Sequence, residues 1–76
     1  MRQPISLRRQ GAWLIASSGS WQMHSVQGPL EGGDPQRQIF RVLTANEEIL
    51  FISRPVGERG MRELTLESIQ PVEQSA

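Results

Sequence analysis

The chain contains Arg37-Gln-Ile-Phe-Arg-Val-Leu-Thr44, followed by Glu47-Glu-Ile-Leu-Phe-Ile-Ser53 and by Met61-Arg-Glu-Leu-Thr-Leu66. These segments are rich in β-branched and aromatic residues, and turn-forming residues separate them, which is typical of strands joined by turns. The structural rival is a helix through residues 39–52, but Asn46 lies at its middle and the β-branched content disfavours it. The sequence therefore predicts an all-β protein.

The length of 76 residues and the lack of cysteine limit what the chain can build. A domain of this size typically buries about 60% of its unfolded surface, so we expect one small core. The prediction is a single small β-barrel domain over residues 1–76, with its core at about 4–72 and a frayed tail at 73–76. Without cysteine we expect no disulfide and no cysteine-based metal site, and His24 alone cannot hold zinc. The expected compartment is the cytoplasm.

The charges balance overall but are unevenly placed along the chain. Eight arginines match eight acidic residues, so the net charge gives no reason for nonspecific nucleic-acid binding. Arg2, Arg8 and Arg9 stand alone in the first ten residues, whereas residues 10–30 contain no Asp, Glu, Lys or Arg. The apolar run at 12–16 is shorter than the roughly 7 to 15 residues of an export signal and far shorter than a membrane span. We therefore expect neither export nor membrane contact.

Outside the central segments the pattern predicts further short strands and turns. Residues 4–8 alternate apolar and polar side chains, as an edge strand does. Residues 12–16 and 21–26 flank a Ser-Ser-Gly-Ser turn, which predicts a hairpin with Ser18-Gly19 at its tip. The remaining predicted elements are loops at 27–36 and 55–60 and a single helical turn at 67–69.

The register of the central hairpin decides which of its side chains form the core. With Ala45-Asn46 as a two-residue turn, Val42 lies opposite Ile49 and Phe40 lies opposite Phe51, so these four side chains share the core face. The opposite face then carries an apolar patch around Arg41, which is unusual on a small monomer. This patch is the candidate oligomer interface, and its residues are Ile39, Leu43, Leu50 and Ile52. The alternative is that the amino-terminal segment or a neighbouring strand covers it.

The first hairpin provides the candidate binding surface. With its predicted turn, one face carries Leu14, Ala16, Trp21 and Met23, and the other carries Trp13, Ile15, Gln22 and His24. Trp13 is expected directly opposite His24, and an exposed tryptophan near arginines can stack on a base or contact a protein. The candidate residues for binding a nucleic acid or another partner are Arg2, Arg8, Arg9, Trp13, His24, Arg37 and Arg41. The alternative is that Trp13 only shields an edge of the barrel.

No pattern in the sequence indicates catalysis. Ser17, Ser18 and Ser20 lie near His24 in the sequence, but a triad also needs an acid to orient the base, and the first hairpin contains no Asp or Glu. Glu47 and Glu48 are adjacent on a strand and point to opposite faces, so they are not a paired acid and base. The glycines at 28–33 lack the Gly-Lys-Ser/Thr ending of a phosphate loop. The protein is therefore predicted not to be an enzyme.

The order of the short apolar segments resembles a known layout. It comprises Pro4-Ile-Ser-Leu-Arg8, Ser20-Trp-Gln-Met-His-Ser-Val26 followed by Gly28-Pro29, Arg37-Gln-Ile-Phe-Arg-Val-Leu-Thr44, Ile49-Leu-Phe-Ile-Ser-Arg54 and Glu63-Leu-Thr-Leu66. This layout resembles a small uncharacterised bacterial domain associated with Y-family translesion DNA polymerases and their accessory proteins. The likeness covers residues 4–69, but the chain lacks the paired tryptophans expected in the long loop and has Leu64 or Leu66 where an aromatic is expected. The resemblance implies an accessory module in DNA repair, with Arg37, Phe40, Arg41 and Arg54 on the matching central hairpin.

Together these observations predict a five-stranded antiparallel meander that closes into a small SH3-like or Tudor-like barrel, because such strands have few other ways to hide their edges. The predicted function is a non-enzymatic binding or adaptor module, one form of which is an accessory to a DNA-repair or other nucleic-acid machine. The alternative is a self-assembling structural protein that uses its apolar sheet face. The predicted partners are a protein or a single-stranded nucleic acid, with a homodimer as the alternative, and no cofactor or metal is predicted.

Overall fold

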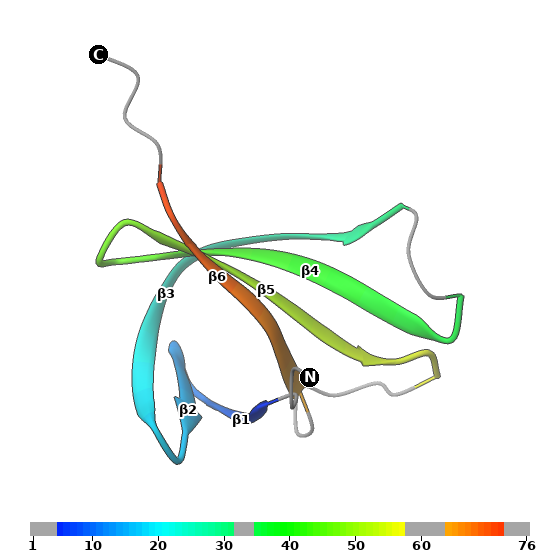
Figure 1. Ribbon diagram of the computed structural model, residues 1–76, viewed down its shortest axis with the longest axis horizontal. Coiled ribbons are helices and arrows are strands. Elements are labelled where there is room, and N and C mark those ends of the chain that lie inside the picture. The colour runs from blue at the N-terminus through cyan, green and yellow to red at the C-terminus, as the bar shows by residue number, and fades with distance from the viewer. Residues whose placement is uncertain (1–4, 32–34, 58–63, 73–76) are drawn as a thin grey trace.

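The computed structural model describes residues 5–31, 35–57 and 64–72. They form an all-β structure with six antiparallel strands (Figure 1). The strands are β1 (Ile5–Gln10), β2 (Trp13–Ala16), β3 (Gly19–Leu30), β4 (Arg37–Thr44), β5 (Glu48–Pro55) and β6 (Leu64–Pro71). Each strand pairs with the next in the chain, and β1 also pairs with β6, which closes the ring of hydrogen bonds. The all-β prediction is confirmed, whereas the predicted number of five strands is too small by one.

The closed ring is not evenly barrel-like, because β3 belongs to both of its sides. The first residues of β3 pair with β2, and the residues from Met23 onward pair with β4. An irregularity between Met23 and Ser25 marks the point of transfer, where His24 is an extra residue, and such bulges increase the bend of a strand. Figure 1 shows the result: β3, β4 and β5 extend together on one side, while β1 and β2 curl beneath the other.

The core fills the space between these two sides. Its eight buried apolar residues come from β1, β2, β4, β5 and β6, and they are Leu7, Leu14, Phe40, Val42, Leu50, Ile52, Leu64 and Leu66. Ala16, Trp21 and Met23 pack against this cluster and are partly buried. At about 25 cal/mol per Å² of buried apolar surface, a set of this size is the main favourable term available to so short a chain.

The register of the central hairpin differs by one residue from the prediction. Val42 pairs with Leu50 and Phe40 with Ile52, so the loop has three residues, 45–47, rather than two. Its last residue, Glu47, has φ +61°, and its N–H donates to the Thr44 carbonyl at 3.2 Å. A turn followed by a left-handed residue is the usual form of a three-residue hairpin loop.

This one-residue difference exchanges the two faces of β5. Leu50 and Ile52 are fully buried in the core, whereas Ile49 and Phe51 lie on the outer face and are half-buried. The predicted patch of Ile39, Leu43, Leu50 and Ile52 is therefore not a single surface, because its two β5 members point inward. The predicted core pair Phe40 and Phe51 is wrong for the same reason, since side chains on a strand alternate between faces.

The first hairpin was predicted with the right faces and the wrong turn. Ala16 pairs with Gly19 and Trp13 with Gln22, so the turn is Ser17-Ser18 and the register differs by two residues from the prediction. A shift of two residues keeps every side chain on its own face. Leu14, Ala16, Trp21 and Met23 accordingly face the core, as predicted.

Two loop predictions are also corrected. Residues 67–69 do not form a helical turn but belong to β6, which pairs with β5 as far as Pro71 and has an irregularity at Glu67. The predicted loop at 27–36 begins late, because β3 continues to Leu30. Within β3, Gly28 has φ +142°, and a Cβ built on it would lie 2.7 Å from Phe40 Cδ1, so the chain needs glycine there. Met61 and the 73–76 tail lie outside the described residues.

Candidate functional site

The outer face of the first three strands presents Trp13 to solvent. Gln10 pairs with Trp13, and Trp13 pairs with Gln22, so these side chains lie side by side across β1, β2 and β3. Arg8 and Ile15 form the next pair on the same face. We call this surface the Trp13 face and define it by Arg8, Gln10, Trp13, Ile15, Ser20, Gln22 and His24. It faces away from the core, because the alternate residues Leu14, Trp21 and Met23 pack inward.

Trp13 and Arg8 are the chemically distinctive members of this face. Trp13 is 44% exposed although tryptophan is largely buried in most proteins. Arg8 lies diagonal to it, one residue pair away, within the reach of a long side chain. Arg8 is exposed and makes no hydrogen bond or ion pair within the described part of the chain. Its charge is therefore available to a ligand beside the indole ring.

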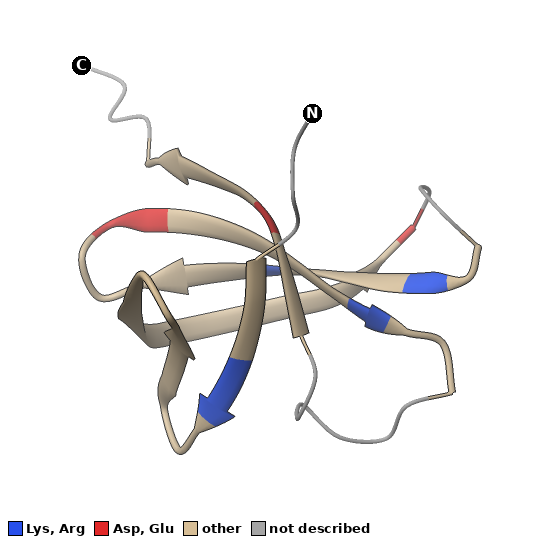
Figure 2. Cartoon of the chain, turned by 60° about the horizontal axis from the view of Figure 1, so that its bottom comes forward, with Lys and Arg blue, Asp and Glu red and all other residues tan. Residues whose placement is uncertain are grey.

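The charged side chains on the strands that form the Trp13 face are of one sign. No Asp or Glu occurs in the first thirty residues, so β1, β2 and β3 as far as Leu30 carry no carboxylate side chain. Figure 2 shows the arginines at the end of β1 and no acidic segment on β1 or β2. An anionic group approaching these strands meets no carboxylate on them. The adjoining loop at 45–47, whose Ala45 N–H donates to the Gln22 carbonyl at 2.9 Å, carries Glu47 beyond the rim of the face.

The other described residues predicted to bind with Arg8 and Trp13 lie at different distances from these two side chains. His24 is exposed at the β3 bulge, and strand alternation puts it on the Trp13 face, diagonal to Trp13 rather than opposite it. Arg9 lies on the opposite face of β1, paired with Leu14, and its Nε donates to the Gly11 carbonyl at 3.0 Å. Arg2 lies outside the described residues. The predicted group thus reduces to Arg8 and Trp13, with His24 at its margin.

Arg37 belongs to a separate polar network that joins β4, β5 and β6. Its Nε donates to Ser53 Oγ at 3.0 Å and its Nη2 donates to Thr65 Oγ1 at 3.1 Å, which ties β4 to β5 and β6. Ser53 Oγ in turn donates to Glu67 Oε1 at 2.5 Å. Ser53 is almost fully buried beneath this network, and its hydroxyl links the arginine to the carboxylate. Sequence reasoning missed Ser53, Thr65 and Glu67, and the one available signal was a serine at the end of the apolar run of β5.

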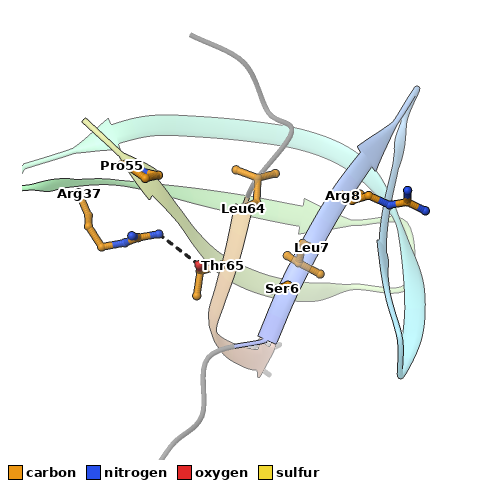
Figure 3. Close-up of a pocket in the computed structure, with 7 residues that line it drawn as sticks. All are labelled: Ser6, Leu7, Arg8, Arg37, Pro55, Leu64 and Thr65. Carbon is orange, nitrogen blue, oxygen red and sulfur yellow. Dashed lines mark hydrogen bonds between the residues drawn. The ribbon is translucent and has the colours of Figure 1, made fainter. Parts of the chain in front are cut away.

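A pocket adjoins this network. It has a volume of about 610 Å³ and is lined by Ser6, Leu7, Arg8, Arg37, Pro55, Leu64 and Thr65. Figure 3 shows the Arg37 guanidinium directed toward Thr65, whereas the Arg8 guanidinium points away from Arg37. The two guanidinium groups therefore do not converge on one point. The one directed toward the pocket is that of Arg37, which already donates hydrogen bonds to Ser53 and Thr65.

The other residues implied by the resemblance are held within the central strands. The Arg54 guanidinium carbon lies 5.0 Å from the centre of the Phe40 ring, and its Nε donates to Gln38 Oε1 at 3.0 Å. Phe40 is buried, so this stacked arginine covers one end of the core. Arg41 points along the outer face of β4, where its Nη1 donates to Gln27 Oε1 at 3.4 Å. Arg41 and the Trp13 face therefore lie on different sides of the protein.

Within the described ranges, no group of three or more His, Cys, Asp or Glu side chains is arranged to hold a metal ion. That part of the chain also has no helix long and apolar enough to cross a membrane. No protein-family model, curated protein or solved structure matches this sequence.

Proposed function

We propose that this protein is a non-enzymatic binding module that contacts an anionic, base-bearing partner, single-stranded nucleic acid, through the Trp13 face. The observation that carries the proposal is an exposed tryptophan diagonal to an arginine on three strands that carry no carboxylate. Stacking of a base on an aromatic side chain contributes about 1–3 kcal/mol, and the neighbouring arginine can pair with a phosphate.

The strength of this interaction follows from the number of cations near the indole ring. Among the described residues only Arg8 shares the face with Trp13, and Arg9 lies at the end of the same strand with its side chain on the other face. Each phosphate contact on a single strand contributes about 0.7 to the salt-dependence slope, so one or two contacts give a slope of about 0.7 to 1.4. Binding should therefore be weak, and stacking should supply most of it.

Tryptophan fluorescence tests the proposal, because the chain has two tryptophans in different environments. Trp21 packs against the core, whereas Trp13 is exposed, so a Trp21→Phe variant makes the signal report on Trp13 alone. Titration with short single-stranded DNA and RNA at low salt should quench this signal. Replacing Arg8 by Ser should weaken the quenching, while the matched change Arg41→Ser, on the other side of the molecule, should leave it unchanged.

The outcomes separate the ligand classes. Loss of quenching in Arg8→Ser with retention in Arg41→Ser supports the proposal. Absence of quenching in the parent protein contradicts nucleic-acid binding and favours a protein partner for this face. Equal effects of the two arginine changes would also contradict it, because nonspecific attraction would then explain the signal.

The closed ring of six antiparallel strands also supports an SH3-like or Tudor-like form for the barrel. An accessory role in DNA repair is the function that the resemblance implies, and a single-strand contact through Trp13 is the activity that such a module would supply. A gel-shift comparison of single-stranded and duplex DNA tests this activity, since only exposed bases can stack on the indole ring.

A further inference from the structure

The outer face of β4 and β5 carries mostly apolar side chains, although it points away from the core. Ile39 and Leu43 from β4 and Ile49 and Phe51 from β5 lie on it, all half-buried by one another. Leu30 at the end of β3 pairs with Ile39 and adds a side chain that is 38% exposed. We call this surface the Arg41 face and define it by Leu30, Ile39, Leu43, Ile49 and Phe51 around Arg41. An outward sheet face of a small soluble protein normally carries polar and charged residues instead.

The residues that surround the Arg41 face resemble the rim of a protein interface. Ser25 and Gln27 border it on β3, and Ser68 and Gln70 border it on β6, because each pairs in register with a residue of β4 or β5. All four are polar and uncharged. An apolar centre with an embedded arginine and a polar rim is the usual composition of a protein interface.

The charges on this side of the molecule are few and asymmetrically placed. Arg41 lies on β4, level with Phe51, while Glu67 lies two strands away on β6, beside Ser68. Arg37, at the start of β4, is already linked to Glu67 through Ser53. Glu67 is nevertheless exposed, and one strand, β5, separates it from Arg41 on β4. Because neighbouring strands lie about 4.8 Å apart, Arg41 and Glu67 are offset by about 5 Å to either side of β5.

We propose that two copies of this protein associate through the Arg41 face, around a two-fold axis that runs along β5 between the facing sheets. This operation places Phe51 on its symmetry mate and sets each Arg41 opposite Glu67 of the second copy. A two-fold axis perpendicular to the strands would instead place Arg41 of one copy near Arg41 of the other, and two like charges repel each other. The charge pattern therefore fits a second copy of this chain in one orientation, as a symmetric interface requires.

This inference does not rest on the proposed nucleic-acid function, because the Trp13 face and the Arg41 face lie on opposite sides of the core. The test is a charge exchange followed by sedimentation velocity at about 10–100 μM, where a weak dimer is populated. The parent protein should sediment as a dimer. Arg41→Glu and Glu67→Arg should each convert it to a monomer, because each change replaces two attractive pairs by two repulsive ones, which should raise the dissociation constant about tenfold or more.

The double variant, with Arg41→Glu and Glu67→Arg in one chain, should restore the dimer. The matched control is Arg8→Glu, a charge reversal on the Trp13 face that should leave the dimer intact. Circular dichroism checks that each variant folds. If Glu67→Arg fails to fold, the neutral pair Arg41→Gln and Glu67→Gln replaces it, because glutamine still offers an acceptor to Ser53; both changes should then weaken the dimer.

A parent protein that is monomeric at about 100 μM would overturn the proposal. Failure of the double variant to dimerise, with its fold intact, would also overturn it, because the Arg41–Glu67 pairing would then be absent. A dimer that dissociates in Arg8→Glu but persists in Arg41→Glu would place the interface on the Trp13 face instead.

Discussion

Truncation of Leu50 tests the register of the β4–β5 hairpin, because the register decides which side chains of β5 face the core and which face outward. Leu50 is fully buried among the core residues of the facing strands, whereas its neighbour Ile49 is half-buried on the outer face. Leu→Ala changes at fully buried sites cost about 2–5 kcal/mol, while a partly exposed side chain loses about 1 kcal/mol of burial. We therefore expect Leu50→Ala to be far more destabilising than Ile49→Ala.

The size of this difference is large for so short a chain. At about 0.05–0.15 kcal/mol per residue, 76 residues give a total stability of about 4–11 kcal/mol. A loss of about 3 kcal/mol should lower the melting temperature by roughly 12–24 °C, since about 4–8 °C corresponds to each kcal/mol in domains of this size. Ile49→Ala should lower it by about 4–8 °C.

The assay is thermal and urea denaturation followed by circular dichroism, at several protein concentrations extrapolated to dilution. Dilution matters because Ile49 belongs to the proposed dimer contact, and loss of association also lowers an apparent melting temperature. Equal losses in the two variants, or a larger loss for Ile49→Ala, would show that the faces of β5 are assigned the wrong way round. The core described above would then be incorrect.

Two further changes test local features of the fold. Gly28→Ala should destabilise the protein by about 1–3 kcal/mol in urea denaturation, because the φ of +142° and the close approach of Phe40 leave no room for a Cβ. Gly19→Ala is the control and should have little effect, because a Cβ on Gly19 would have nothing within 4 Å. Equal effects of the two changes would contradict this account. Glu67→Ala should lower the free energy of unfolding by about 1–3 kcal/mol, because it leaves the buried Ser53 hydroxyl without its acceptor. Glu67→Gln should recover most of this loss in the same assay. No recovery would show that the charge of Glu67 matters and not the hydrogen bond.

The two hairpins show why the sequence predicted one pair of faces and not the other. In the first hairpin, apolar and polar residues partly alternate, and an error of two residues in the turn left Leu14 and Trp21 on the core face. In β5 the run Ile49-Leu-Phe-Ile52 is apolar throughout, so no alternation fixes its register. The turn length alone decided it, and the left-handed Glu47 made that turn one residue longer than expected.

The sequence predicted which side chains of the candidate site lie on the same face of the sheet, but not which of them are cross-strand neighbours. The outward position of Trp13 followed from the inward position of Leu14, and the structure confirms it. Its neighbour was not predictable, because the choice between Gln22 and His24 depends on the position of the turn. The Arg37, Ser53 and Glu67 network joins three strands, so its members are distant in sequence and no local pattern indicates it.

Faces and strand edges are separate routes to binding in this fold. A sheet edge can bind a partner by adding a strand, and closure of the ring by β1 and β6 limits the edges that are open to this. Among the described residues, the part of β3 beyond Met23 pairs only with β4 and so keeps one open edge. The Trp13 face and the Arg41 face instead use side chains that project outward from the ring. The Trp13 face offers an indole and a cation on strands without a carboxylate, and the Arg41 face offers an apolar patch with a cation and a carboxylate on either side of β5. A dimer built on the second side would hold two copies of the first side facing away from each other, so one flexible ligand long enough to reach both would bind more tightly than either face alone.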